Sequence, residues 1–238
     1  FNNFGLETKL FHQSKFLNKK LISLLGFKLY SGSNSTKQGP GSSSSDANFN
    51  FQSTLFPNYE NQSNYSNPNL NYSIFNENIF YLNDKMSIVP GFRFEYIQTA
   101  SDGHYRDINT DAAGNVILND LIFTNDVRKR SLLLYGIGYS FRFLSFSEFY
   151  SNYSRNYRAV TFSDINIVSP SFIINPNISD ESGYTIDLGF RGNYKNFIFY
   201  DFSTFYLFYS DRIGFVQRPF FDGSVKNEKG NVGDALLY

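Results

Sequence analysis

The sequence predicts an all-β protein and, within that class, an antiparallel transmembrane β-barrel. Three features lead to this prediction. Apolar and polar residues alternate along much of the chain, as in strands whose two faces meet different surroundings. Many of these segments run about ten residues, the length that a tilted strand needs to cross a bilayer. The connections alternate between short turns and long polar stretches, a pattern that barrels produce when their two ends differ in loop length.

The first two predicted strands are residues 4–10 and 21–29. In the first, Leu6 and Leu10 oppose Glu7 and Lys9, so one face is apolar and the other is charged. The second repeats this pattern with large apolar residues opposite glycine and lysine. The short connection between them contains His12 and is expected to be a turn.

The next predicted hairpin joins residues 69–82 to residues 86–96 through the tight turn Asn83-Asp84-Lys85. Residues 86–96 alternate clearly, because Phe92 and Phe94 oppose Arg93 and Glu95. The first strand alternates less cleanly and is predicted because it completes the hairpin.

Two further hairpins follow the same rule. Residues 133–143 and 146–154 are joined by Leu144-Ser145, and residues 183–192 and 198–208 by Asn193-Tyr194-Lys195. We predict eight strands from these patterns, and residues 231–238 resemble the start of a ninth.

Long polar stretches separate the hairpins and are expected to be loops. They cover residues 31–68, 99–130, 155–181 and 211–231. Loops beyond about 12–15 residues are uncommon in compact soluble domains, and a soluble sandwich has no reason to place long and short loops at opposite ends. The sequence therefore favours an apolar face toward lipid and a charged face toward an interior.

Composition narrows the function. Lys plus Arg equals Asp plus Glu, 21 each, which argues against a nucleic-acid partner because phosphate binding usually requires a basic surplus. Aromatic residues make up 19% of the chain, as aromatic girdles at both membrane interfaces would require. Cys is absent, which excludes disulfides and thiolate metal sites.

The face predicted to point inward carries charges of both signs: Glu7, Lys9, Lys28, Arg93, Glu95, Arg142, Asp187, Arg191 and Asp201. Such charges are tolerated only where water or partners reach them. They could pair with one another as a simple polar wall, or the wall could dock an internal plug or guide a solute. Arg93, Glu95, Arg142, Asp187 and Arg191 are the lumen-facing candidates.

No catalytic constellation is found, so we expect no enzyme and no cofactor. The two histidines, His12 and His104, are expected on opposite sides of the membrane, which leaves no Ser-His-acid arrangement. His104 is followed by Arg106, Asp107 and Asp111, but their spacing matches no compact metal site. A basic run at 128–130 could attract an anionic ligand or lie against anionic lipid head groups.

Several segments resemble TonB-dependent outer-membrane receptors. They are RNYRAVTFSD (155–164), NPN (175–177) followed by Glu181, GYTIDLGFRG (183–192), and the hairpin SIFNENIFYLNDKMSIVPGFRFEYI (73–97). The closing NVGDALLY (231–238) resembles the start of a following strand. The nearest branch is the ferric-citrate receptor type.

The resemblance implies an outer-membrane barrel of about 22 strands with a plugged lumen. This chain would supply about eight to nine of them, so residues 1–238 are expected to be a barrel fragment that lacks the plug domain. It implies uptake of an iron chelate such as ferric citrate or a siderophore, energised by the TonB–ExbB–ExbD complex through the missing N-terminal part of the parent protein.

For an anionic chelate, the resemblance directs attention to cations of the outer loops: Arg106, Arg128, Arg155, Arg158 and His104. Tyr153 and Tyr157 are expected in the aromatic girdle that contacts lipid.

Two alternatives stay open from the sequence. A complete small barrel acting as a passive porin or adhesin would require residues 1–10 to pair with residues 231–238. A soluble all-β carbohydrate-binding or enzymatic domain would leave the sorting of the loops unexplained.

Overall fold

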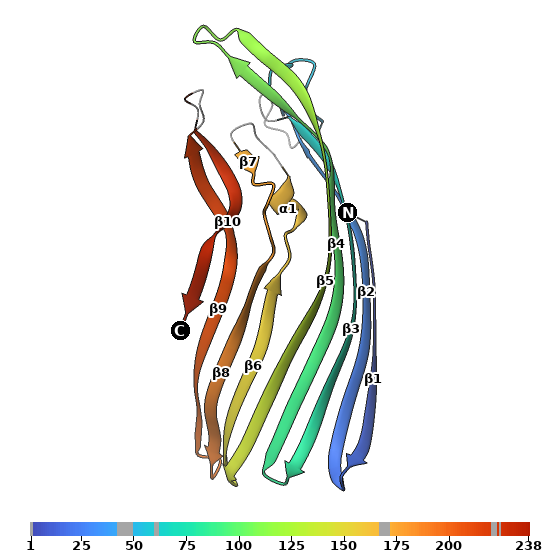
Figure 1. Ribbon diagram of the computed structural model, residues 1–238, viewed down its shortest axis with the longest axis vertical. Coiled ribbons are helices and arrows are strands. Elements are labelled where there is room, and N and C mark those ends of the chain that lie inside the picture. The colour runs from blue at the N-terminus through green and yellow to red at the C-terminus, as the bar shows by residue number, and fades with distance from the viewer. Residues whose placement is uncertain (1, 42–49, 60–61, 167–171, 220–222, 224) are drawn as a thin grey trace.

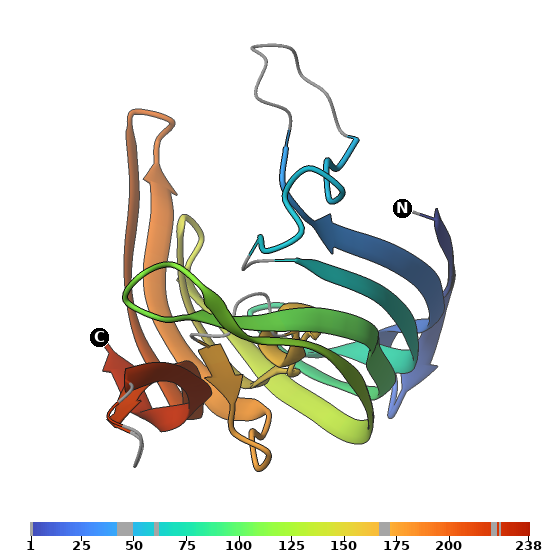
Figure 2. The ribbon, with the colours of Figure 1, turned by 90° about the horizontal axis from the view of Figure 1, so that it is seen from above.

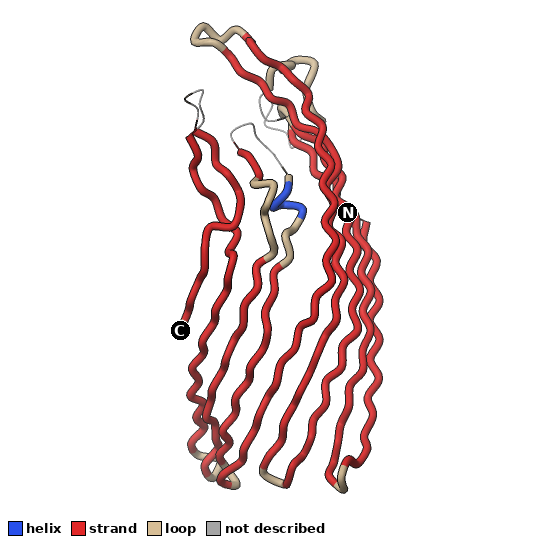
Figure 3. Tube along the Cα trace, in the orientation of Figure 1, coloured by secondary structure: helices blue, strands red, loops and turns tan. Residues whose placement is uncertain are grey.

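The computed structural model describes residues 2–41, 50–59, 62–166, 172–219, 223 and 225–238. Its secondary structure is almost entirely strand (Figure 3). The elements are β1 (Asn2–Phe16), β2 (Lys19–Gln38), β3 (Ser63–Asn83), β4 (Met86–Thr110), β5 (Val116–Leu144), β6 (Ser147–Arg158), α1 (Phe162–Ile165), β7 (Phe172–Ile174), β8 (Glu181–Tyr194), β9 (Ile198–Pro219) and β10 (Val225–Leu237).

The strands form one ten-stranded sheet in the order β1-β2-β3-β4-β5-β6-β8-β9-β10-β7. All neighbours pair antiparallel except β10 and β7, which pair in parallel. The sheet curls into an open half-barrel, and α1 lies on its concave side (Figures 1 and 2). The all-β antiparallel prediction is confirmed, and the eight predicted strands correspond to β1–β6, β8 and β9.

The predicted short turns are confirmed and gather at one end of the sheet (Figure 1). The β1–β2 connection is only Leu17 and Asn18, with φ values of 49° and 59°. A two-residue hairpin with both central φ angles positive is type I′, whose twist matches that of the strands. His12 was predicted in this turn, and that is wrong, because β1 continues to Phe16 and pairs His12 with Ser23.

The prediction of four long loops is confirmed in two places and wrong in two: long connections remain at 39–62 and 159–180, whereas most of 99–130 and 211–231 is strand. β4 and β5 continue through most of residues 99–130 and leave only 111–115 between them. With 25 and 29 residues, these strands are far longer than the roughly ten residues that cross a bilayer. β2, β3, β9 and β10 likewise extend into stretches predicted to be loops. Outside a membrane both faces of a hairpin can meet water. Its sequence therefore need not alternate between apolar and polar residues, and the pattern that predicts a strand is absent.

The convex face carries a band of exposed apolar side chains. Phe92 is 50% exposed, and Leu133 and Ile137 are each 49% exposed. On successive strands of this face, Tyr72 stacks on Tyr96 near the outer edge of the band. The pattern of an exposed apolar band with aromatic residues at its edges is that of a barrel wall that contacts hydrocarbon.

The opposite edge of the band, near the short turns, is also aromatic. Phe16 packs edge-on against Phe80, and Phe190 stacks on Phe143 and Tyr200. On β3 the two edges are eight residues apart, from Tyr72 to Phe80.

Candidate functional site: the concave face

The concave face collects the charged residues that the sequence assigned to an interior. Paired residues on neighbouring strands share a face, and Glu7 pairs with Lys28, Asn152 with Asp187. The same register places all five lumen-facing candidates here: Arg93, Glu95, Arg142, Asp187 and Arg191. One strongly polar surface therefore extends across the sheet from β1 to β9.

Part of this surface is neutralised by local ion pairs. Arg93 lies 3.1 Å from Glu95, which also accepts a hydrogen bond from the Asn71 amide at 2.7 Å. Arg191 lies 3.1 Å from Glu148. These contacts fit the interpretation of a wall that pairs with itself, although Arg142 makes no ion pair among the described residues.

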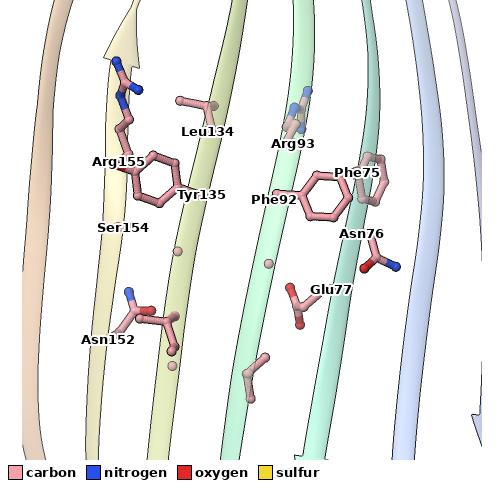
Figure 4. Close-up of a pocket in the computed structure, with 15 residues that line it drawn as sticks. Phe75, Asn76, Glu77, Phe92, Arg93, Leu134, Tyr135, Asn152, Ser154 and Arg155 are labelled. Atoms are coloured by element: carbon pink, nitrogen blue, oxygen red, sulfur yellow. The ribbon is translucent and has the colours of Figure 1, made fainter.

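A hollow lies on this face where three glycines, Gly91, Gly136 and Gly138, meet on β4 and β5. Its volume is about 480 Å³ (Figure 4). The side chains around it include Phe75, Glu77, Arg93, Leu134, Asn152 and Ser154. Because glycine has no side chain, space is left above these three residues. The charged and aromatic side chains around this space could make polar and apolar contacts with an occupant.

Nearer the outer end, the chain between β6 and β8 folds back against the concave face (Figure 2). We call residues 159–180 the inward segment, of which the structure describes 159–166 and 172–180. It contains α1 and a small core of Val160, Ile165 and Ile178, each 5% exposed or less. β7, at its centre, pairs with β10.

Asp180 ties the inward segment to β5. Its carboxylate accepts hydrogen bonds from Arg130 Nε at 2.7 and 2.8 Å and from the Val160 backbone N–H at 2.7 Å. The Tyr157 hydroxyl also donates to it. Arg130 also donates to the Thr99 hydroxyl and the Val160 carbonyl, so three groups hold it in place.

Glu181 is the second anchor, at the start of β8. Its side chain is 2% exposed, and its carboxylate lies 2.9 Å from Arg158 and 3.0 Å from Arg212. It also accepts a hydrogen bond from the Ile213 backbone N–H at 3.0 Å. A buried carboxylate is stable only with such partners, and these join β6, β8 and the bulge of β9.

Asp164 in α1 is the third anchor. Its side chain is 2% exposed, and it pairs with Lys229 at 2.9 Å and Arg158 at 3.1 Å. The backbone N–H and the hydroxyl of Thr161 also donate to it. Burial disfavours the charged carboxylate, but these hydrogen bonds, that of Lys229 foremost, outweigh it and lower the pKa of Asp164 from 3.8 to about 2.

Two of the predicted ligand cations belong to this network. Arg158 bridges Asp164 and Glu181, and its side chain is still 40% exposed. Arg128 pairs with Asp126 at 3.1 Å and donates to the Ile178 carbonyl at 2.8 Å. Both lie on the concave side with their charge partly offset.

The other three candidates lie on the convex side of the sheet. His104 faces Phe123, with ring centroids 5.4 Å apart, and Arg106 donates to the Asn119 side chain. Both were predicted in a loop, and that is wrong, because they lie within β4. Arg155 pairs across strands with Tyr184 on the apolar face, so the register separates it from Arg128 and Arg158.

Sequence reasoning missed most of the network: Asp164, Asp180, Glu181, Arg212 and Lys229 were never assigned to a common site. The available signal was the density of opposite charges between residues 155 and 181. Lys229, however, joins from 65 residues further along the chain than Asp164, and no periodicity reports such a contact. No group of His, Cys, Asp or Glu within the described ranges could hold a metal ion.

A match to a family model over nearly the whole chain identifies the family. The family model of the TonB dependent receptor-like beta-barrel matches residues 2–237. The chain belongs to the TonB-dependent receptor β-barrel family. The predicted resemblance is thereby confirmed, and the open sheet is part of a TonB-dependent receptor barrel. No curated protein sequence matches the chain significantly.

Solved structures show the same fold. The closed form of the ferric-catecholate import receptor Fiu from E. coli K12 is 11% identical, with a TM-score of 0.64. The copper transporter OprC is 15% identical with a TM-score of 0.61, and the ferric yersiniabactin uptake receptor FyuA from Yersinia pestis is 14% identical with a TM-score of 0.58.

These structures are much longer than the chain. The match covers 94% of this chain and 33% of Fiu, 98% and 34% for OprC, and 98% and 30% for FyuA. The chain therefore spans about a third of each. TonB-dependent receptor barrels are outer-membrane receptors and transporters. Among the described residues, no helix is both long and apolar enough to be a membrane span.

Proposed function

We propose that this chain is a fragment of the barrel of a larger TonB-dependent receptor in the outer membrane, and that the receptor takes up an iron chelate. The observation that carries the proposal is the charged concave face, which runs the length of the sheet opposite an exposed apolar band. Such a wall suits an interior that holds a plug or guides a polar solute. The uptake of iron chelates named for Fiu and FyuA supports the choice of cargo.

We propose ferric citrate or another siderophore as the ligand and the TonB–ExbB–ExbD complex as the source of energy, acting through parts of the receptor outside this chain. The receptor needs no bond chemistry, because it moves its cargo unchanged. Of the five predicted ligand cations, Arg128 and Arg158 suit an anionic chelate best, since they lie on the concave side at the outer end. His104, Arg106 and Arg155 face the other way.

The test measures binding and uptake of ⁵⁵Fe-labelled ferric citrate and a catecholate by cells whose only such receptor is the complete protein. Arg128→Gln should weaken binding of the anionic chelate by about fivefold to tenfold, as expected for loss of one charged contact. Arg158→Gln should weaken it at least as much, because it also removes a basic partner from Asp164 and Glu181. The control, Lys85→Gln at the short-turn end, should leave binding unchanged. Absence of iron binding by the unaltered receptor, or equal loss in the control, would contradict the proposal.

A further inference from the structure

A group of polar side chains interrupts the apolar band of the convex face where β1, β2 and β3 lie side by side (Figure 1). Asn76 pairs across strands with Leu25 and Phe92, which are 49% and 50% exposed, so its side chain lies on this face. Asn78 follows two residues later on the same strand and therefore shares the face. The register continues from Asn78 to Ser23 on β2 and from Ser23 to His12 on β1. We call these four residues, His12, Ser23, Asn76 and Asn78, the polar patch.

The polar patch lies inside the apolar band and not at its edge. On β3, Asn76 is four residues from Tyr72 at the outer aromatic edge and four residues from Phe80 at the inner one. On β1, His12 is four residues from Phe16, whose ring packs against that of Phe80. His12 and Asn76 therefore lie at about the same depth, in the middle of the band.

The sheet satisfies only part of the hydrogen-bonding capacity of the polar patch. Asn78 donates to the Asn76 side chain, and Asn76 donates to the Leu24 carbonyl at 3.0 Å. Within the part of the chain that the structure describes, the side chains of His12 and Ser23 make no hydrogen bond. A polar group that faces hydrocarbon without a partner is costly, because acyl chains offer it no hydrogen bond. The patch therefore suits contact with another membrane-embedded protein rather than with lipid.

Two properties of the polar patch favour a second copy of the receptor as the partner. The neutral imidazole, the hydroxyl and the two carboxamides can each donate and accept a hydrogen bond, and none of them carries a charge that would repel its own copy. The patch can thus pair with itself, as a twofold-symmetric interface requires. Copies of one receptor in one membrane also share their depth and orientation, so the patch of one copy lies level with the patch of the next.

We propose that the polar patch is the contact through which two copies of the receptor associate side by side in the membrane. His12 and the two asparagines of one copy hydrogen-bond to those of the other, about a twofold axis along the membrane normal. Leu10 and Leu25, which are 64% and 49% exposed beside the patch, pack around these bonds and exclude lipid. The contact uses the convex face and leaves the free edge of β1 available for pairing. The proposal rests on the membrane placement of the apolar band and not on the iron chelate.

The first test is oxidative cross-linking of the complete receptor, with any other cysteine removed, in outer-membrane preparations. Leu25→Cys lies beside the polar patch, and Leu133→Cys, which is equally exposed at 49%, lies on β5 away from it. We expect a disulfide-linked receptor dimer from Leu25→Cys and only the background level from Leu133→Cys.

The second test measures the association constant of the labelled receptor by counting single molecules in bilayers of varied lipid content. His12→Leu and Asn78→Leu should each lower this constant by about threefold, the effect of one hydrogen bond between membrane-embedded segments. Ser151→Leu is the matched control, because Ser151 is a polar residue of the same face on β6, paired with Leu188. It should leave the association constant unchanged.

Three results would overturn the proposal: equal cross-linking of the two cysteine variants, an association constant that His12→Leu and Asn78→Leu leave unchanged or that Ser151→Leu lowers as much, or a disulfide from Leu25→Cys mainly to a different outer-membrane protein. Compact mobility of the leucine variants on an unheated gel shows that they are folded. A receptor that associated as expected but bound no iron chelate would reject the proposed function and leave the contact between copies standing.

Discussion

At the scale of single residues, the turn between β1 and β2 places a leucine where the backbone favours Asn or Gly. Leu17 has φ of 49°, and its side chain is 82% exposed, so no burial compensates for the left-handed backbone. A non-glycine residue in this region costs about 1–2 kcal/mol, and Asn tolerates it better than most. We expect Leu17→Asn to raise the free energy of unfolding of the receptor by about 0.5–1 kcal/mol.

Urea unfolding of the receptor in detergent checks this expectation through the midpoint concentration. Leu17→Ala is the control, because it removes the exposed apolar side chain without easing the backbone. Equal midpoints for the Asn and Ala variants would show that the backbone conformation of Leu17 carries no measurable cost.

Substitution by alanine should affect stability differently at two glycines of the concave face. A Cβ added at Gly183 would lie 1.9 Å from the Phe208 carbonyl oxygen, so β8 and β9 would have to separate. A Cβ at Gly91 would meet no atom closer than 3.6 Å, because it points into the hollow. Gly183→Ala should destabilise by about 1–3 kcal/mol, whereas Gly91→Ala should be neutral or slightly stabilising.

The measurement is the fraction of receptor that keeps the compact, detergent-resistant mobility of a folded barrel on an unheated gel. Gly183→Ala should reduce this fraction while Gly91→Ala leaves it unchanged. The same loss in both variants would mean that the strand spacing at Gly183 is not the limiting contact.

Alternation predicted which face each charged residue occupies but not what it touches. Arg93 and Asp187 were assigned to one face because a strand has a period of two, and the register places them there. The predicted placement of His104 and Arg155 depended instead on predicted loops. Those loops were wrong in part, because the strands of a polar hairpin do not alternate between apolar and polar residues. The partners of Glu181 come from β6 and β9, and long-range pairing of this kind leaves no mark on local sequence.

At the scale of elements, the inward segment is held by buried carboxylates rather than by a large apolar core. Its core is Val160, Ile165 and Ile178, with Ile174 and Ile213 packed against it. Three acids, Asp164, Asp180 and the adjoining Glu181, connect it to four strands, β5, β6, β9 and β10, through their basic partners. Removing charge from one acid should therefore release the segment without unfolding the sheet, whose strands are paired independently of it.

The pKa of Asp164 gives this release a pH range. The pKa of Asp164 is lowered in the folded protein to about 2, so the ionised carboxylate stabilises the docked segment fully at pH values above 3.8, the ordinary pKa of this group. This stabilisation is lost as the pH falls from about 4 to about 2. We expect cleavage by pepsin within 159–180 to increase over that interval, before the sheet itself is cleaved.

Asp164→Asn should make the segment susceptible at pH 4 already, since the amide cannot replace a carboxylate facing Lys229 and Arg158. Asp111→Asn at the tip of the β4–β5 hairpin is the matched control and should behave like the unaltered protein. The order and sites of cleavage, identified by mass spectrometry, are the observables. Simultaneous cleavage of the segment and β6 would contradict independent release.

At the scale of the whole molecule, the sheet has two open edges. β1 pairs only with β2, and β10 pairs with β9 and β7, so no described strand joins the ends of the sheet. Exposed strand edges are sites of further pairing, and we propose that further strands of the receptor complete the wall. The alternative of a small complete barrel requires β1 and β10 to meet, which the strand order does not show.

Engineered cysteine pairs distinguish the two architectures, because the chain has no cysteine of its own. Leu6 and Leu29 are cross-strand partners on β1 and β2, so Leu6→Cys with Leu29→Cys should form a disulfide on oxidation. Leu6→Cys with Leu236→Cys would link β1 to β10 only if the chain closed on itself. We expect the first pair to cross-link in the complete receptor and the second not to, as seen by mobility on a non-reducing gel. Efficient cross-linking of the second pair would mean that these strands close a small barrel, and the proposal that further strands complete the wall would fail.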